Sequence, residues 1–300
     1  MSAAALRRTW LAAVTVATAL ALAGAGPLRA QGVGLENTSN SKEPVTIEAD
    51  DGIEWHQKER IYLARGNARA IRGDVTVHAE TLTAHYREVG NGKTEIYQVV
   101  ADGGVVITTA REKITGDTGV YDVDRGVFRL TGKSLLIETP EEKVSARDKI
   151  EYFSQEKKAV LVGDATVLKD NRKVRADTMT ARFAADPKGK MALSRADIVG
   201  NVVITTPTEV ARAERGVYNA NSGIATLTGG VKLTRGDNQL NGEFAEVNLK
   251  SGVSRLLASP DGTASGTGRV RGVFMPRSAE EGGGDGGALI PGLPNGQGGK

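Results

Sequence analysis

The chain has 300 residues, enough for one or two domains, and its 4% aromatic content with 38 glycines fits an extended all-β chain with many turns better than a helical bundle. It contains no cysteine, which excludes disulfides, thiolate metal sites and an acylated N-terminal cysteine. The net charge of +3 comes from Arg7, Arg8 and Arg29, and the remaining 36 basic and 36 acidic residues give no overall electrostatic attraction to nucleic acid.

Residues 1–30 have the three parts of a secretory signal peptide. Arg7-Arg8 is the basic n-region, residues 10–25 are an apolar stretch, and Leu28-Arg29-Ala30 provides a cleavage site after Ala30. Cleavage after Ala25 and an uncleaved anchor helix are the alternatives, although 16 apolar residues are few for a span of about 20. We predict an exported protein, with residues 31–43 as a flexible leader.

From residue 45 the chain repeats itself. Residues 45–141 align with residues 142–238 without a gap, at an offset of 97 positions. Gly103-Gly104-Val105-Val106-Ile107-Thr108-Thr109 matches Gly200-Asn201-Val202-Val203-Ile204-Thr205-Thr206, and Gly119-Val120-Tyr121 matches Gly216-Val217-Tyr218. A gapless match of this length predicts two tandem modules of similar structure.

Within each module apolar and polar residues alternate with a period of two, the pattern of half-buried β-strands. Val75, Val77 and Ala79 share one face, and Leu82 and Ala84 continue it with shifted parity, so this strand must contain a bulge or a corner. No segment has the period of an amphipathic helix. We predict about 18 to 20 antiparallel strands of ordinary length between residues 44 and 259, followed by a glycine-rich, largely disordered tail over residues 260–300.

The sequence contains no obvious catalytic or metal-binding constellation. Its three histidines, His56, His78 and His85, lack metal-ligand spacing. There is no Gly-x-Ser-x-Gly elbow, and no helix follows Gly103-Gly104 to bind a phosphate. We therefore expect no metal, no cofactor and no enzymatic activity, although the many Asp and Glu residues leave a hydrolase open.

A rolled sheet of this kind offers two surfaces for binding. Its ends expose unpaired backbone groups that recruit further strands. Its inner faces form either a filled sandwich core, which the composition favours, or an incompletely filled groove for acyl chains, in which each buried methylene contributes ~0.8 kcal/mol.

Residues 44–259 resemble the LptA/OstA family of periplasmic lipopolysaccharide-transport proteins. The resemblance is carried by Val45-Thr46-Ile47-Glu48-Ala49-Asp50, by Ala64-Arg65-Gly66-Asn67-Ala68, and by Val120-Tyr121 leading into Phe128-Arg129-Leu130-Thr131-Gly132. It implies a twisted β-jelly-roll of consecutive antiparallel strands, a groove for lipid A, and end-to-end strand pairing with inner-membrane and outer-membrane transport proteins or with further copies. The duplication makes this body longer than the usual single roll.

On this basis we expect a periplasmic lipid carrier and bridge. The edge strands would be residues 45–50 and 243–257, with Val45, Ile47, Ala49, Phe244, Val247 and Leu249 as contact residues. The groove residues would be Val75, Val77, Leu82, Ala84, Tyr86, Val105, Ile107 and Leu130 in the first module, and Val174, Met179, Ala181, Phe183, Val202, Ile204 and Leu227 in the second.

Two rival hypotheses remain. The first is a cell-envelope scaffold with a filled β core and no lipid. The second is a parallel β-solenoid enzyme acting on polysaccharide, whose rungs would repeat evenly. The glycines that begin successive units here are instead unevenly spaced, at Gly66, Gly103, Gly132, Gly163, Gly200 and Gly229.

Overall fold

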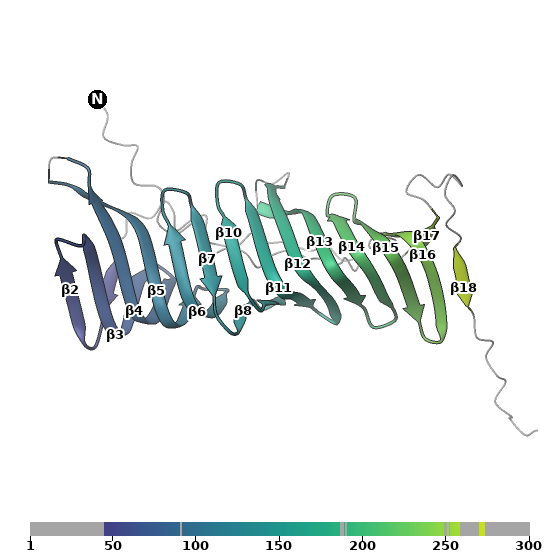
Figure 1. The fold of residues 1–300 in the computed structure, drawn as a ribbon, viewed down its shortest axis with the longest axis horizontal. Coiled ribbons are helices and arrows are strands. Elements are labelled where there is room, and N and C mark those ends of the chain that lie inside the picture. The colour runs from purple at the N-terminus through teal and green to yellow at the C-terminus, as the bar shows by residue number, and fades with distance from the viewer. Residues whose placement is uncertain are drawn as a thin grey trace, which may run out of the picture.

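The computed structural model describes residues 45–90, 92–186, 189, 191–248, 251, 253–258 and 270–273. These residues form an elongated, twisted all-β roll, and no helix occurs among them (Figure 1). The strands are β1 (Thr46–Glu48), β2 (Gly52–His56), β3 (Ile61–Arg72), β4 (Val75–Glu88), β5 (Thr94–Thr108), β6 (Lys113–Asp122), β7 (Val127–Thr131), β8 (Leu135–Glu138), β9 (Glu142–Ala146), β10 (Lys149–Phe153), β11 (Lys158–Lys169), β12 (Arg172–Ala185), β13 (Met191–Thr205), β14 (Val210–Asn219), β15 (Ile224–Arg235), β16 (Asn238–Asn248), β17 (Val253–Leu257) and β18 (Arg271–Val273).

The sheet is folded into two facing rows because its long strands bend in the middle. Row A contains β1, β8, β9 and β18, and row B contains β2, β7, β10 and β17. Each of the long strands, β3 to β6 and β11 to β16, has one half in row A and the other half in row B. For example, β6 pairs with β7 through residues 118–122 and with β8 through residues 113–115. All pairings are antiparallel, and the two rows enclose the core between them.

The bend is produced by β-bulges at the same point of successive strands. Gly66 and Asn67 of β3 lie opposite the single residue Glu80 of β4, and the same two-against-one arrangement recurs where β5 meets β6. A bulge turns a strand and reverses which face its side chains occupy. The parity shift predicted between Ala79 and Leu82 is therefore confirmed as a corner of the roll.

At these corners a glycine lies against an acidic residue that belongs to the neighbouring strand or directly precedes it. A Cβ added to the glycine would come within 2.2 to 2.7 Å of the acidic residue in each of these pairs: Gly66 with Asp51, Gly103 with Glu80, Gly132 with Asp117, Gly163 with Asp148, Gly200 with Asp177, and Gly229 with Glu214. The recurrence of glycine at these corners is therefore explained by packing, because any side chain there would overlap the neighbouring acidic residue.

The internal repeat of the sequence is reproduced strand by strand. At the offset of 97 positions, β2 to β6 have the same bounds as β10 to β14. The bulges coincide as well, since the register shifts between Arg65 and Ala68 and between Val162 and Ala165. The expectation of two tandem modules in an all-β jelly-roll is confirmed.

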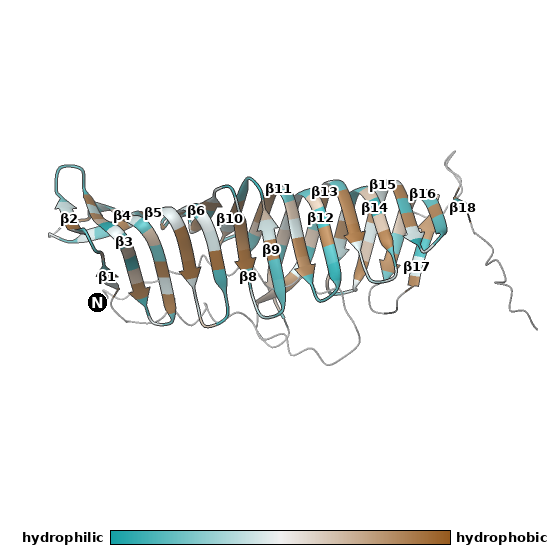
Figure 2. Cartoon of the chain, turned by 90° about the horizontal axis from the view of Figure 1, so that it is seen from below, coloured by the Kyte–Doolittle hydropathy of each residue, from teal (hydrophilic) through white to brown (hydrophobic). Residues whose placement is uncertain are grey.

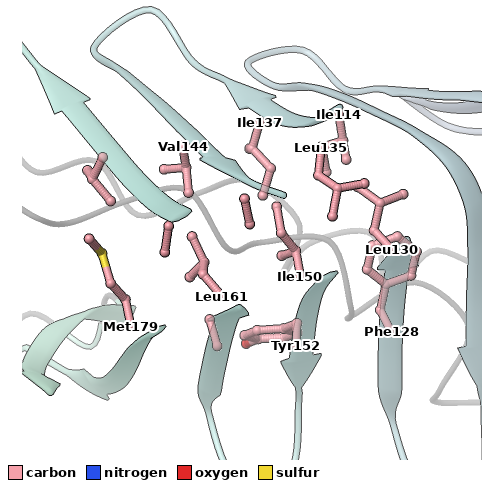
Figure 3. Packing of buried hydrophobic residues seen from close by; sticks show 14 of the residues in the cluster. Ile114, Phe128, Leu130, Leu135, Ile137, Val144, Ile150, Tyr152, Leu161 and Met179 are labelled. Atoms are coloured by element: carbon pink, nitrogen blue, oxygen red, sulfur yellow. The ribbon is translucent and has the colours of Figure 1, made fainter. Parts of the chain in front are cut away.

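One buried hydrophobic cluster runs through both modules, from Ala64 on β3 to Ala245 on β16. Seen from below, apolar residues recur along successive strands of the roll (Figure 2). Between the modules, Ile137 and Val144 of row A point toward Leu130, Ile150 and Leu161 of row B (Figure 3). A fully buried Leu or Ile stabilises the fold by about 1.5–3 kcal/mol, so this seam joins the modules into one body.

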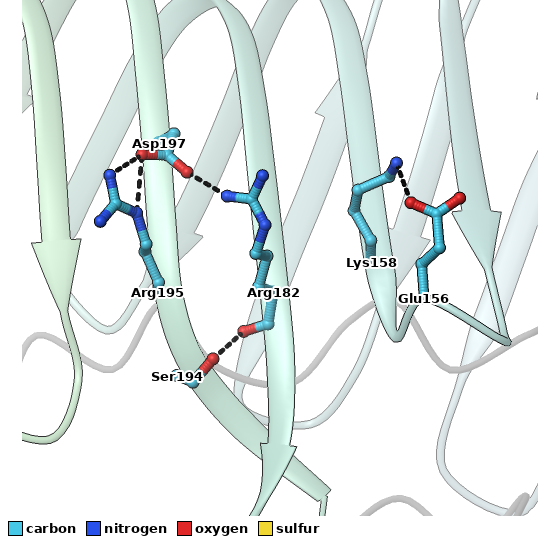
Figure 4. Close-up of polar contacts among 6 residues, drawn as sticks. All are labelled: Glu156, Lys158, Arg182, Ser194, Arg195 and Asp197. Atoms are coloured by element: carbon cyan, nitrogen blue, oxygen red, sulfur yellow. Dashed lines mark hydrogen bonds and ion pairs between the residues drawn. The ribbon is translucent and has the colours of Figure 1, made fainter.

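A second bulge in row B is held by polar contacts on the outer face. Ser194 is the extra residue where β12 meets β13, and its hydroxyl donates to the Arg182 carbonyl at 2.9 Å (Figure 4). Asp197 accepts from Arg182 at 2.5 Å and from Arg195 at 2.6 Å. These groups are partly exposed, so each ion pair stabilises the fold by only about 0.2–1 kcal/mol.

The predicted signal peptide, leader and most of the tail lie outside the described residues. Within the stretch assigned to the tail, Arg271–Val273 forms β18, which pairs with β16 in row A. In the described part of the chain, no helix is long and apolar enough to span a membrane.

Candidate functional site

An apolar cavity of about 460 Å³ lies between the two rows at the N-terminal end of the roll. Val45 and Ile47 line it from the row A side, Ile53 and Tyr62 from row B, and its wall extends as far as β7. This volume falls within the ~300–1,000 Å³ typical of ligand pockets. Arg72 is the one charged residue among those that line it. The cavity can therefore accept an apolar group.

Small side chains leave this space open in the first module. Ala64, Ala70 and Ala101 line the cavity. At the offset of 97 positions their counterparts are Leu161, Val167 and Ile198, which are buried in the core of the second module. At these three positions the first module therefore has smaller side chains than the second.

The far wall of the cavity is formed by Tyr121 of β6 and Phe128 of β7. Beyond it, Leu130 and Ile150 are completely buried and close the core. The counterpart of Phe128 is Ala225, so the large ring at this position belongs to the first module alone. Burial, and next the charge of Asp122, raise the pKa of Tyr121 to about 12, so its hydroxyl stays neutral at physiological pH.

An aromatic cluster on row B flanks the open end of the cavity. Trp55 stacks on Tyr62 with ring centroids 5.8 Å apart, and Tyr62 contacts Tyr86 at 4.9 Å. The Trp55 indole Nε1–H donates to the Tyr86 hydroxyl at 2.7 Å. These contacts hold β2 against β3 and β4, although β2 pairs with β3 on one side only among the described residues.

The predicted groove residues fall into three groups. Val75, Val77, Leu82, Ala84 and Ile107 line the cavity. Tyr86, Val105 and Leu130 are buried beside it. In the second module the core contains the buried Val174, Met179, Val202 and Leu227 and, packed against them, the half-buried Ala181, Phe183 and Ile204. Lipid contact at all of these positions stays a prediction.

Several lining residues were not among the predicted groove residues. They are Ile53, Tyr62, Leu63, Ala64, Ala70, Ile71, Arg72, Thr83, Ile96, Val99, Ala101, Gly119, Tyr121 and Phe128, together with the edge residues Val45 and Ile47. The sequence feature that could have indicated a cavity here is the contrast between small residues in the first module and larger residues at the equivalent positions of the second.

The predicted edge residues lie near the two ends of the roll. Ile47 lies on β1, flanked by Val45 and Ala49, and β1 pairs only with β3 among the described strands. Phe244 and Val247 lie on β16, opposite Leu257 and Ser254 of β17, so β17 and β18 are the outermost of the described strands at the C-terminal end. Leu249 lies outside the described residues.

Three carboxylates are buried near the seam between the modules. Glu151 accepts from Arg129 at 2.7 Å and lies 2.8 Å from Lys149 Nζ. Glu112 is 3% exposed, and neither carboxylate oxygen has a hydrogen-bond partner among the described residues. Burial, and next the charge of Glu142, raise the pKa of Glu112 to about 8. No cluster of three or more His, Asp or Glu side chains in the described part of the chain is arranged to hold a metal ion.

The chain matches one family model twice. The model, described as LptA/(LptD N-terminal domain) LPS transport protein, matches residues 46–158 and residues 143–253. An uncharacterized protein of Rhizobium meliloti (strain 1021) is 28% identical over 138 residues, covering 45% of this chain and 71% of the relative. The crystal structure of LptH, described as the LptA homologous periplasmic component of the lipopolysaccharide transport device of Pseudomonas aeruginosa, aligns with 78% of this chain and 97% of its own length, at 12% identity and a TM-score of 0.21. The two family matches together span more than half of the sequence, and the chain therefore belongs to the LptA/LptD N-terminal domain family of lipopolysaccharide-transport proteins.

Proposed function

We propose that this protein is a periplasmic carrier that binds the acyl chains of lipid A and has no catalytic step. The observation that carries the proposal is the apolar cavity between the rows at the N-terminal end, which opens beside the outer edges of β1 and β2. Family membership supplies the substrate class, lipopolysaccharide.

The physical basis of binding is the transfer of methylenes from water into this cavity. Each buried methylene stabilises the complex by about 0.8 kcal/mol. The lining is almost wholly aliphatic and aromatic, and Arg72 supplies one cationic group. An acyl chain with an anionic headgroup has the matching distribution of apolar and charged parts.

We further propose that the roll bridges transport components of the inner and outer membranes through strand pairing at its ends. At the N-terminal end β1 and β2 pair only with β3, and at the C-terminal end β17 and β18 pair only with β16, among the described strands. Unpaired strand edges expose backbone donors and acceptors that an added strand would satisfy. Export by the predicted signal peptide would deliver the chain to the periplasm.

In vivo photo-crosslinking tests the lipid assignment. A photoreactive amino acid at Val77, which lines the cavity, is expected to capture lipopolysaccharide. The matched control is Thr76, the neighbouring residue on the other face of β4. A bulky charge at Val77 is expected to reduce capture from a second cavity position, Ile107. If lipopolysaccharide is captured neither at Val77 nor at Ile107, the cavity is not a lipid site.

Placing the same crosslinker at Val174 tests whether lipid passes through the second module. Val174 is the counterpart of Val77 but is buried in the closed core. Capture at Val174 as well as Val77 would mean that the roll opens along its length during transport, and capture at Val77 alone would confine binding to the first module.

The second candidate function is a cell-envelope scaffold that binds only protein. The closed core of the second module, where Leu161 and Ile198 fill the space left open by Ala64 and Ala101, favours this alternative. Native mass spectrometry separates the two functions, because a carrier purified from its own envelope is expected to retain a lipid adduct and a scaffold is not.

A further inference from the structure

The side chains that line the cavity become less exposed along the roll. At the N-terminal tip, Ile47 on β1 is 40% exposed and Ile53 on β2 is 57% exposed. At the other limit of the lining, Tyr121 on β6 is 9% exposed and Phe128 on β7 is 6% exposed. The cavity therefore has an open end, at β1 and β2, and a closed end, formed by Gly119, Tyr121 and Phe128.

The order of the strands gives the distance between these two ends. In row B, β2 to β7 follow one another as neighbours. Neighbouring strands lie about 4.8 Å apart, so the five steps from β2 to β7 give the lining a length of roughly 24 Å. Arg72, the charged residue of the lining, lies on β3, which pairs with β1. An amphiphile is therefore oriented with its polar group toward the open end and its terminal methyl group toward β7.

The closed end has room for one small group before the Phe128 ring. A Cβ built on Gly119 would lie 3.5 Å from the Phe128 ring and 3.6 Å from a methyl group of Val105. These are ordinary contact distances, so the space above Gly119 holds a methyl group and then ends at Phe128. On the next strand Tyr152 lies opposite Phe128 and is itself buried (Figure 3). The wall at the closed end is therefore two rings thick.

The second module has no such space at the equivalent place. Its Gly216 is the counterpart of Gly119, and a Cβ there would lie 3.1 Å from Leu227, which is tighter than an ordinary contact. The counterpart of Phe128 is Ala225, so the same fold closes at this position without a ring. The architecture does not require the Phe128 ring, which is found only in the module that has a cavity in front of it.

We infer that the cavity selects acyl chains by their length, with Phe128 as the limit and Gly119 as the position of the terminal methyl group. The inference rests on the proposed carrier function, and it adds the property of the lipid that the protein distinguishes. Each further methylene that fits between the open end and Phe128 raises the affinity about fourfold, and a methylene left in water at the open end adds nothing.

Binding of straight-chain saturated fatty acids of increasing length measures this limit. Trp55 provides the readout, because it is the only tryptophan after the predicted signal peptide and it stacks on Tyr62, which lines the cavity. Fluorescence titrations of the mature chain are expected to show the affinity rising about fourfold for each methylene up to one chain length, and no further rise beyond that length.

Two substitutions at the closed end are expected to move the limit in opposite directions. Phe128→Leu keeps an apolar side chain but makes it shorter, and is expected to move the limit to longer chains. Gly119→Ala places a methyl group in the terminal space, and is expected to move the limit to shorter chains and to weaken binding of the chain that fits the wild type about fourfold. The φ of Gly119 is not positive, so alanine is accepted there without backbone strain.

Gly216→Ala is the matched control. It adds the same methyl group at the equivalent position of the second module, and Gly216 is not among the residues that line the cavity. The contact with Leu227 is expected to lower the stability of this variant, whereas the chain-length limit is expected to stay that of the wild type. A change in the limit that merely followed stability would appear in this control as well.

The inference is overturned if affinity rises with chain length without a limit, if Phe128→Leu and Gly119→Ala both keep the wild-type limit, or if Gly216→Ala moves it. It is also overturned if fatty acids do not bind while lipopolysaccharide is captured at Val77. In each of these cases capture at Val77 would still support a carrier, one that does not measure chain length. Conversely, a chain-length limit without capture of lipopolysaccharide would leave this inference intact and refute the lipopolysaccharide carrier.

Discussion

Gly103 lies so close to Glu80 that a Cβ built on the glycine would be 2.6 Å from the Glu80 Cβ. Gly103 also has a φ of +83°, whereas a Cβ at the adjacent Gly104, with φ of +62°, would meet nothing within 4 Å. The two neighbouring glycines therefore differ in their surroundings, which makes them a matched pair for testing the corner.

We predict that Gly103→Asn lowers the free energy of unfolding by roughly 1–3 kcal/mol, because the side chain would overlap Glu80. Gly104→Asn is expected to be neutral or slightly stabilising, because its counterpart Asn201 adopts a φ of +49°. Urea denaturation of both variants measures the difference. Equal destabilisation by both would show that backbone strain, and not contact with Glu80, decides the outcome.

Filling the cavity is expected to abolish lipid binding without unfolding the protein. Ala64→Leu with Ala101→Ile places in the first module the side chains that the second module already holds in its core as Leu161 and Ile198. We predict loss of lipopolysaccharide capture at Val77 and an unchanged or higher melting temperature.

The control for cavity filling is Leu161→Ala in the second module. This variant leaves the cavity lining intact but removes a buried side chain, and is expected to lower stability by roughly 2–5 kcal/mol while lipid capture at Val77 persists. Undiminished capture by the filled variant would show that acyl chains bind elsewhere.

Glu112 is predicted to make the fold less stable as the pH rises. Burial raises its folded-state pKa to about 8 from 4.5, so between these pH values the unfolded chain ionises first and binds fewer protons than the folded one. Glu112→Gln is therefore expected to stabilise the protein by roughly 1–3 kcal/mol at pH 8 and to have little effect at pH 4. The melting temperature measured across this range checks the sign.

Glu209 provides the internal comparison for Glu112. It occupies the equivalent turn at the offset of 97 positions but forms an ion pair with Arg235 at 2.8 Å. Glu209→Gln is expected to give no gain in stability at pH 8. A gain of the same size in both variants would mean that general surface charge, and not the buried Glu112 carboxylate, controls the pH dependence.

Glu151 should show the opposite dependence on pH. Burial acts to raise its pKa, but hydrogen bonds from Lys149 and Arg129 outweigh burial and hold the pKa below its ordinary value. Its ion pairs therefore stabilise the fold above about pH 4.5, and this contribution disappears as the pH falls through the folded-state pKa. Glu151→Gln is expected to lower the free energy of unfolding by about 1 kcal/mol at pH 7, and by progressively less as the pH falls below 4.5, as chemical denaturation at a series of pH values would show.

The repeat and the alternation of the sequence were sufficient to predict the architecture. The face of Val77 and Val174 follows from their parity, and the break after Ala79 marks the corner, because both are local properties of one strand. The cavity was not predictable in this way. Val77 lines the cavity together with the small residues Ala64, Ala70 and Ala101 of other strands. Around Val174 the counterparts of these three alanines are larger and are buried in the core.

Predicting which described strand is outermost at the C-terminal end also requires a comparison of residues that are far apart in the sequence. The predicted edge, residues 243–257, includes the end of β16 and all of β17, but its contact residues Phe244 and Val247 lie on β16, and β17 continues the sheet beyond them. The similarity of residues 252–256, Gly-Val-Ser-Arg-Leu, to residues 126–130, Gly-Val-Phe-Arg-Leu, was the available signal, but it lies at a different offset from the main repeat.

Among the described strands, β9 and β10 each pair on both sides whereas β1 and β2 each pair on one side, and this difference has a consequence for local opening. Amide hydrogens at the middle of the rod can exchange only after strands outside them have detached, whereas those at either tip are released by fraying. Exchange is therefore expected to advance inward from both tips, with Ile150 and Leu130 among the last positions to exchange.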